Sequence, residues 1–311
     1  MAGRAPVLRK AVLFVILSAP SLAGARLAYY SDYFSFVGQD EQGRVAFALD
    51  TNRGQDGREF QAEHFAVLHA EGQGWIGLRG SGPFPNTGQV LEGLTDSEHF
   101  RFSGTPESGM TIESPENSLS LRIDAIPVHL DRKRGQDRYW MGSVSATLVW
   151  AGRTLPGRVI YEHIHFEDWN RLARTYPGFW RDFHGLYLLL RDPATGDLGD
   201  LYLHRQRSEK LAGLTGLVDG FAVADGTILR LEGAEIHVTG HRPALGFYRW
   251  PRSWEGRWTG EGGELTFSLE LEDRKTITNW IIGGFAMGIA RGTVEIRGRT
   301  WDAYGLGEII K

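Results

Sequence analysis

Residues 161–165, Tyr-Glu-His-Ile-His, place one carboxyl group and two imidazoles inside a stretch that otherwise reads as a hydrophobic β-strand, residues 159–166. Side chains alternate between the two faces of a strand, so Ile160, Glu162 and Ile164 are predicted to share one face. Glu162 is then a lone charged group among apolar side chains. Burial disfavours the ionised form of a carboxyl and raises its pKa, so Glu162 is expected to hold a proton near neutral pH and to be able to donate it.

The same residues allow two other interpretations. A strand-borne glutamate more often pairs with an arginine or a backbone amide and has a purely structural role. His163, His165 and Glu167 project to one side at period two, and a His-x-His pair on a strand can hold a transition metal. In such enzymes the carboxylate ligand usually follows several residues farther on, and this sequence has no glycine-bounded version of that spacing. We therefore predict neither a metal nor another cofactor, and keep a metal-dependent enzyme using His163 and His165 as a third alternative.

The elements that would position these groups are predicted to be strands. Leu265, Phe267, Leu269 and Leu271 alternate with polar residues, which is the pattern of a half-buried strand. Further strand candidates are residues 29–37, 44–49, 60–69, 140–150, 185–190, 201–204 and 292–298. Asp-Gly pairs at 56–57, 219–220 and 225–226 suit tight hairpins. Trp250, Trp254 and Trp258 are interleaved with arginine, proline and glycine, and we predict a loop there.

Composition agrees with an all-β protein. The 311 residues include 41 glycines, 10 tryptophans, 10 tyrosines and 16 phenylalanines, as expected for short strands and tight turns around an aromatic interior. The chain is longer than a single core usually is, which leaves two domains or one large β-architecture open. A net charge of −4 argues against a nucleic-acid partner. With no cysteine, the fold uses no disulfide.

A short helix at residues 168–176, capped by Asp168 and ended by Pro177, is predicted near the middle of the chain. The halves on either side both open with aromatic residues beside an acid, Asp32 in the first and Asp182 in the second. We interpret this as a weak internal duplication. Two antiparallel barrels of about eight strands, each able to enclose a small ligand, would fill the chain, one at 26–166 and one at 167–311.

The amino terminus predicts export. Basic residues precede an apolar run at 11–17, and Ala-Gly-Ala at 23–25 suits a signal peptidase. Residues 1–25 are thus predicted to be a signal peptide cleaved after Ala25, leaving the protein in the periplasm or on the outer side of a membrane. If left uncleaved, the segment would hold the protein at the membrane periphery. Its apolar run is shorter than the roughly 20 residues of a spanning helix.

Several stretches resemble one known family. Residues 31–36 (Ser-Asp-Tyr-Phe-Ser-Phe), 157–163 (Gly-Arg-Val-Ile-Tyr-Glu-His), 180–190 and 304–308 (Tyr-Gly-Leu-Gly-Glu) are similar to the tandem lipocalin-like proteins typified by carotenoid 1,2-hydratase and AttH. The resemblance implies two calycin barrels in tandem and, for the hydratase, cofactor-independent addition of water to a C=C bond. The family pattern of an aromatic, an acid and a histidine is matched at 161–163, with Glu in place of the usual Asp. The Asn-Trp-Gly that follows in the family is absent.

Hydration of an isolated double bond needs a proton donor, a dry cavity and electron-rich walls for the carbocation. Glu162 is the predicted donor, and His163 or His184 would orient the water. Burial would also raise the pKa of Asp32 and Asp182, which makes them alternative donors. The predicted catalytic residues are Glu162, His163, Asp182 and His184. The predicted ligand contacts are Asp32, Tyr33, Tyr161, His165, Trp169 and Trp180, several of which could stabilise a cation with their rings.

Two main functions follow from the sequence. One is an enzyme that acts on an isoprenoid or other lipid-like molecule by acid catalysis, for example a terpenoid hydratase. The other is an exported carrier or chaperone that shields such a ligand without changing it. The chain contains no nucleophile elbow, phosphate-binding loop or dinucleotide fingerprint, so serine-hydrolase and nucleotide-dependent activities are disfavoured.

Overall fold

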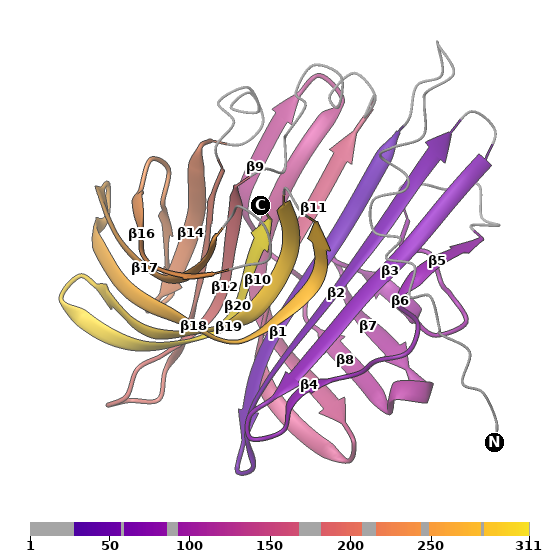
Figure 1. The fold of residues 1–311 in the computed structure, drawn as a ribbon, viewed down its shortest axis with the longest axis horizontal. Coiled ribbons are helices and arrows are strands. Elements are labelled where there is room, and N and C mark those ends of the chain that lie inside the picture. Colours follow the sequence, from indigo (N-terminus) through magenta and orange to yellow (C-terminus); the bar gives the residue numbers. More distant parts are fainter. Residues whose placement is uncertain are drawn as a thin grey trace.

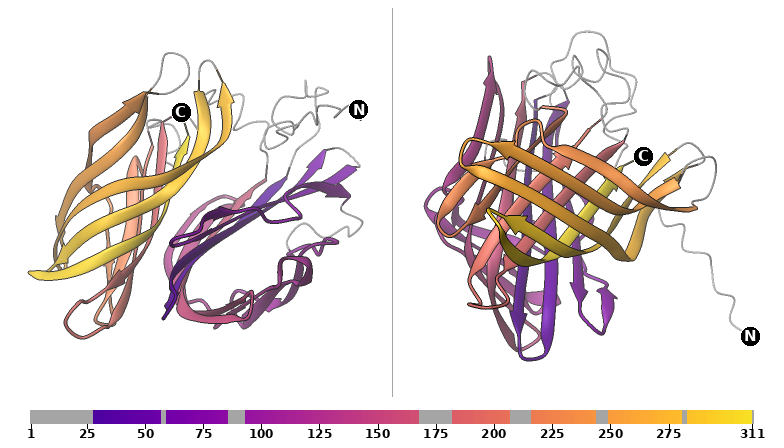
Figure 2. Two further views of the ribbon diagram at one scale, coloured as in Figure 1. Left: turned by 60° about the horizontal axis from the view of Figure 1, so that its bottom comes forward. Right: turned by 90° about the vertical axis from the view of Figure 1, so that its left-hand side faces the viewer.

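The computed structural model describes residues 28–56, 59–85, 93–167, 182–206, 216–243, 249–280 and 283–310. These residues form two curled antiparallel β-sheets that lie side by side (Figures 1 and 2). The predicted all-β fold of two lipocalin-like units in tandem is confirmed. The expected helix at 168–176 and the expected signal peptide at 1–25 lie outside the described residues. Within the described ranges, no helix is long and apolar enough to cross a membrane.

The first sheet, which we call the N-terminal unit, is built from eleven strands. They are β1 (Tyr29–Asp40), β2 (Gly43–Asp56), β3 (Glu59–Ala70), β4 (Gly74–Ile76), β5 (Gly82–Pro85), β6 (Arg101–Thr105), β7 (Gly109–Ser114), β8 (Leu119–Ile123), β9 (Val128–Arg134), β10 (Asp137–Trp150) and β11 (Arg153–Phe166). Their order is β4-β3-β2-β1-β11-β10-β8-β7-β6, with β5 paired to β3 and β9 to β10. A 3-10 turn, η1 (Pro115–Asn117), precedes β8.

The second sheet, the C-terminal unit, has nine strands in the order β15-β14-β13-β12-β20-β19-β18-β17-β16. They are β12 (Phe183–Arg191), β13 (Leu198–Arg205), β14 (Val218–Ala224), β15 (Thr227–Arg230), β16 (Glu235–Pro243), β17 (Arg249–Gly260), β18 (Gly263–Trp280), β19 (Gly283–Ile296) and β20 (Arg299–Ile310). In both units the first strand pairs with the last, β1 with β11 and β12 with β20. This shared order of strands agrees with the predicted duplication.

Glycine allows the same close approach at this pairing in both units. A Cβ on Gly157 of β11 would lie 2.1 Å from the carbonyl oxygen of Val37, and one on Gly305 of β20 would lie 2.0 Å from that of Tyr187. Real Cβ atoms do not come so near to a backbone oxygen, so a side chain at either position would push the paired strands apart.

The period-two pattern of the strands divides the buried side chains into three clusters. One fills the concave interior of the N-terminal unit and includes Phe34 and Trp140. A second fills the interior of the C-terminal unit and includes Leu188 and Trp254. The third, which we call the interface cluster, joins the outer faces of both sheets; its members include Tyr33, Ile160, Tyr139, Tyr187, Tyr202, Met287 and Leu306. Since full burial of one such side chain stabilises by roughly 1.5–3 kcal/mol, the two units are firmly attached.

The expected strands at 29–37, 44–49, 140–150, 185–190 and 201–204 are confirmed within β1, β2, β10, β12 and β13. The prediction of a loop around Trp250 and Trp254 is wrong, because both lie in β17 and pack in the interior of the C-terminal unit. Their spacing of four is twice the strand period, which places them on the same face.

Candidate functional site

The two faces of β11 point into different parts of the molecule. Glu162 pairs in register with Tyr33 of β1 and Met141 of β10. Its neighbours on the same face of β11, Ile160 and Ile164, belong to the interface cluster. The sharing of one face by Ile160, Glu162 and Ile164 is therefore confirmed. Glu162 lies between the two units rather than inside either of them.

Glu162 is buried there beside tyrosine hydroxyls from both units. Glu162 is buried, and only 8% of its surface is exposed. Tyr187 of β12 donates a hydrogen bond to Oε2 at 2.8 Å, and the Tyr139 hydroxyl of β10 also lowers the pKa of the carboxyl. Burial raises the pKa of Glu162 to about 7, because these two hydroxyls offset only part of the lost hydration. The predicted rise is confirmed, and the carboxyl is close to half-protonated at neutral pH.

Two more carboxyl groups with raised pKa values act on this part of the interface. Burial raises the pKa of Asp50 to about 6 even though Ser31 and Asn52 donate hydrogen bonds to it at 2.9 and 3.1 Å. The pKa of Glu308 is raised well above its usual range by burial and then by the charges of Glu162 and Asp50. The three acids thus disfavour one another's ionisation, which favours proton storage at the interface.

Tyr33 brings a free hydroxyl to the same region. Its ring centroid lies 4.9 Å from that of Tyr187, and its residue is 7% exposed. Among the described residues, the Tyr33 hydroxyl has no hydrogen-bond partner. A buried hydroxyl without a partner costs free energy, and a bound ligand or water would recover it.

The opposite face of β11 carries an ionised cluster in the interior of the N-terminal unit. Asp32 forms an ion pair with Arg53 and accepts a hydrogen bond from Tyr161, while His163 Nδ1 lies 2.8 Å from Asp32 Oδ1. Arg53 also donates to the hydroxyl of Thr51 at 2.7 Å. The predicted rise in the pKa of Asp32 is wrong. Burial does raise it, but the charge of Arg53 and the contacts from His163 and Tyr161 outweigh burial and hold the pKa well below its usual range.

Aromatic rings surround this cluster. The Tyr161 ring lies 4.7 Å from that of Trp140, and the His163 ring lies 6.1 Å from it. His165 stacks on Tyr30 at 4.2 Å. His163 and His165 are therefore engaged by side chains of β1, on the face of the sheet away from Glu162, and His163 is not placed to orient a water beside Glu162. In the described part of the chain, three candidate metal ligands meet only at the surface, at Glu98, His99 and Glu116.

The structure places Asp182 and His184 in the C-terminal unit, apart from Glu162. Both line a pocket of about 330 Å³ together with Arg205 and His241. Trp254 Nε1 donates to His184 Nδ1 at 3.2 Å, and His184 Nε2 lies 3.6 Å from the carboxylate of Asp182. The four predicted catalytic residues are thus divided among three places. Trp169 and Trp180, two predicted ligand contacts, lie outside the described residues.

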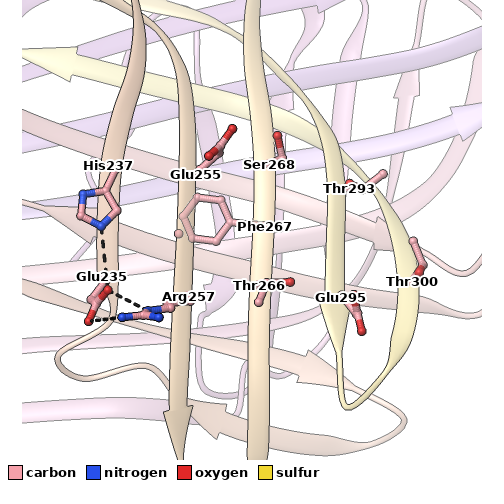
Figure 3. Close-up of a pocket in the computed structure, with 11 residues that line it drawn as sticks. Glu235, His237, Glu255, Arg257, Thr266, Phe267, Ser268, Thr293, Glu295 and Thr300 are labelled. Carbon is pink, nitrogen blue, oxygen red and sulfur yellow. Dashed lines mark hydrogen bonds and ion pairs between the residues drawn. The ribbon is translucent and has the colours of Figure 1, made fainter.

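The outer face of the C-terminal unit has a larger, open groove of about 650 Å³ (Figure 3). Glu235 and Arg257 form a two-point ion pair at its edge, with distances of 2.8 and 3.2 Å. Thr266 and Ser268 add hydroxyl groups on the neighbouring strand. All these side chains are at least partly in water. The acids that line the groove, Glu235, Glu255 and Glu295, are exposed, so none of them resembles the buried Glu162.

Sequence reasoning missed the groups that decide the protonation of Glu162 and Asp32. Arg53 was detectable from the tight turn at 40–43, because that hairpin pairs Asp32 with Thr51 and puts Arg53 two residues farther on the same face. Tyr139 was detectable in the same way, because the hairpin of β10 and β11 pairs Met141 with Glu162 and puts Tyr139 two residues farther on the same face. Tyr187 and Glu308 carry no such local signal, since they reach Glu162 from the other unit.

Comparisons with known proteins support the fold. Neither protein-family models nor curated proteins give a match to the sequence. Among solved structures, a putative AttH (NE1406) from Nitrosomonas europaea superposes with a TM-score of 0.57 at 11% identity, covering 99% of each chain. Kievitone hydratase from Nectria haematococca gives 0.54 at 10% identity, over 90% of this chain and 88% of the other. CghA, solved with Sch210972, gives 0.54 at 12% identity over 91% and 88%. The predicted resemblance to the tandem lipocalin-like proteins is thus confirmed at the level of the fold.

Proposed function

We propose that the protein binds a hydrophobic, lipid-like or isoprenoid small molecule and protonates it from Glu162, with hydration of a C=C bond as the reaction. The observation that carries this proposal is a buried carboxyl whose pKa is raised to about 7 at an apolar interface between two units. A general acid works best when its pKa lies near the working pH. One solved structure with the same fold is, by its name, a hydratase of kievitone.

In this reaction the O–H proton of Glu162 passes to one alkene carbon, and the π electrons form the new C–H bond. The other carbon becomes a cation, water adds to it, and the proton released by that water returns to a carboxylate of the site. The rings of Tyr33 and Tyr187, 4.9 Å apart, are suited to stabilise the cation, by roughly 0.5–2 kcal/mol for a desolvated contact. The unpartnered Tyr33 hydroxyl is suited to hold the water.

A carrier without catalysis is the second candidate. It is favoured by the fact that Glu162 already accepts a hydrogen bond from Tyr187, which also suits a structural carboxyl. Export to the periplasm or the outer side of a membrane is proposed for either function on the basis of residues 1–25.

Glu162→Gln separates the two candidates, because it keeps the shape and removes the acid. The protein, purified from its own host, would first be extracted and its lipids identified by mass spectrometry. Incubation with that lipid or with acyclic terpenoid alkenes in H₂¹⁸O should yield labelled alcohol with the wild type and at least about 100-fold less with the variant, at unchanged affinity. Equal labelling in both would eliminate Glu162 as the acid; binding without labelling in either would favour the carrier.

A further inference from the structure

The pocket of about 330 Å³ lies at the end of the C-terminal unit where β12 begins and β13 ends. Two of its lining residues, His184 of β12 and Arg205 of β13, stand opposite each other in register. Leu186 and Leu203, each two residues away along the same strands, belong to the interior cluster of this unit. Because side chains alternate between the faces of a strand, His184 and Arg205 also point to the interior side. The pocket is therefore a polar end to an apolar interior.

The opposite wall of the pocket is apolar. It comes from β16, where Ile236 and Val238 line the pocket and pack against the interior cluster. Val238 stands opposite Trp254 of β17, and the Trp254 indole donates a hydrogen bond to His184 Nδ1 at 3.2 Å. Since β12 and β17 are not neighbours in the sheet, this hydrogen bond shows that the sheet curls around the pocket. Apolar side chains thus face the charged ones across it.

The Trp254 hydrogen bond fixes the protonation of His184. An indole N–H can only donate, so His184 Nδ1 must accept and carries no hydrogen. The one hydrogen of the imidazole is then on Nε2, which lies 3.6 Å from the carboxylate of Asp182. His184 is therefore neutral in this arrangement and adds no positive charge to the pocket.

Arg205 supplies a guanidinium whose charge is not used by the fold. Within the described ranges of the chain, this guanidinium makes no hydrogen bond and no ion pair. Its five N–H groups form a planar fork that matches the two oxygens of a carboxylate. Asp182 is the one acid among the described lining residues, and its negative charge opposes a ligand with two negative charges more than a ligand with one. The lining therefore fits a single carboxylate better than a phosphate.

We propose that this pocket is a second binding site of the protein and takes a small monocarboxylate with an apolar tail. Arg205 holds the carboxylate, and Ile236 and Val238 contact the tail. A volume of about 330 Å³ is at the lower end for ligand pockets, so the tail is short. The site is apart from Glu162 and does not depend on the proposed acid catalysis.

The hydrogen bond from Trp254 to His184 provides a reporter of binding in this pocket. We would titrate the ¹⁵N-labelled full-length protein with sodium hexanoate and follow the Trp254 indole N–H by NMR, assigned by its loss in Trp254→Phe. Two other probes separate charge from chain: 1-hexanol has the chain without the charge, and inorganic phosphate has charge without the chain. Arg205→Gln removes the guanidinium. Arg242→Gln is the matched control, because Arg242 is an exposed arginine of β16 that does not line the pocket.

Hexanoate should shift the Trp254 signal saturably, with an affinity at least about tenfold weaker in Arg205→Gln and within about twofold of the wild type in Arg242→Gln. In the wild type, 1-hexanol and phosphate should each bind at least about tenfold more weakly than hexanoate. The indole signals of the other tryptophans check that each variant is folded. Unchanged hexanoate affinity in a folded Arg205→Gln, or 1-hexanol or phosphate binding as tightly as hexanoate to the wild type, would overturn the site. None of these results depends on Glu162, whose failure as the acid would appear only in the ¹⁸O labelling.

Discussion

Glu162 and Asp32 are two buried carboxyls on neighbouring strands, on opposite faces of the same sheet, and their pKa values shift in opposite directions. Both lose hydration, which raises the pKa of each. Asp32 has the guanidinium of Arg53 beside it and becomes firmly ionised, whereas Glu162 has only neutral tyrosine donors and retains its proton to about pH 7. Burial alone therefore does not determine the charge of a carboxyl; the nearest cation does.

Removing the cation should break this contrast with the largest effect. Arg53→Met leaves Asp32 buried without its positive partner, and we expect the free energy of unfolding to fall by about 3–5 kcal/mol, measured by urea denaturation. The pKa of Asp32 should then rise as that of Glu162 does. Arg257→Met is the matched control, because it breaks an exposed ion pair with Glu235 and should leave the unfolding midpoint unchanged. A stable Arg53→Met protein with an ionised Asp32 would refute the explanation.

The pH dependence of the unfolding free energy tests the raised pKa of Glu162. Its pKa is higher in the folded protein, about 7, than the 4.5 of a free side chain, so its contribution is fully present below pH 4.5 and is lost as the pH rises through 7. With rising pH this loss lowers the free energy of unfolding by about 3 kcal/mol, and Glu162→Gln should abolish it. The unfolding free energy of the variant should then depend less steeply on pH between 4.5 and 8. Parallel curves for the two proteins would mean that Glu162 titrates normally.

A smaller effect is expected from Tyr187→Phe. The hydroxyl of Tyr187 donates to Glu162 and lowers its pKa against burial, so its loss should raise the pKa of Glu162 further. The cost at acid pH should be about 1 kcal/mol, the usual contribution of one hydrogen bond. Infrared titration of the Glu162 C=O band measures its pKa, and urea denaturation at pH 5 measures the change in unfolding free energy. A lowered pKa would show that Tyr187 does not stabilise the carboxylate.

The sequence contained the information for the faces of β11 and for the class of the fold, because both follow from period-two alternation within one strand. It led to a wrong pKa for Asp32, because the decisive charge comes from Arg53 on the next strand and is found only by carrying the hairpin register across. Tyr187 and Glu308 were beyond such reasoning. They meet Glu162 only when two units of the chain pack outer face to outer face, and no local pattern fixes that packing.

The pairing of first and last strands within each unit also bears on how such a chain can arise and be re-engineered. Tyr29 stands opposite Phe166 in one unit, and Phe183 stands opposite Ile310 in the other. The start of the first strand and the end of the last strand therefore lie next to each other in each unit. A gene segment with this property can be copied head to tail without threading one copy through another, and the order of the copies can be exchanged by circular permutation with only a short connecting peptide.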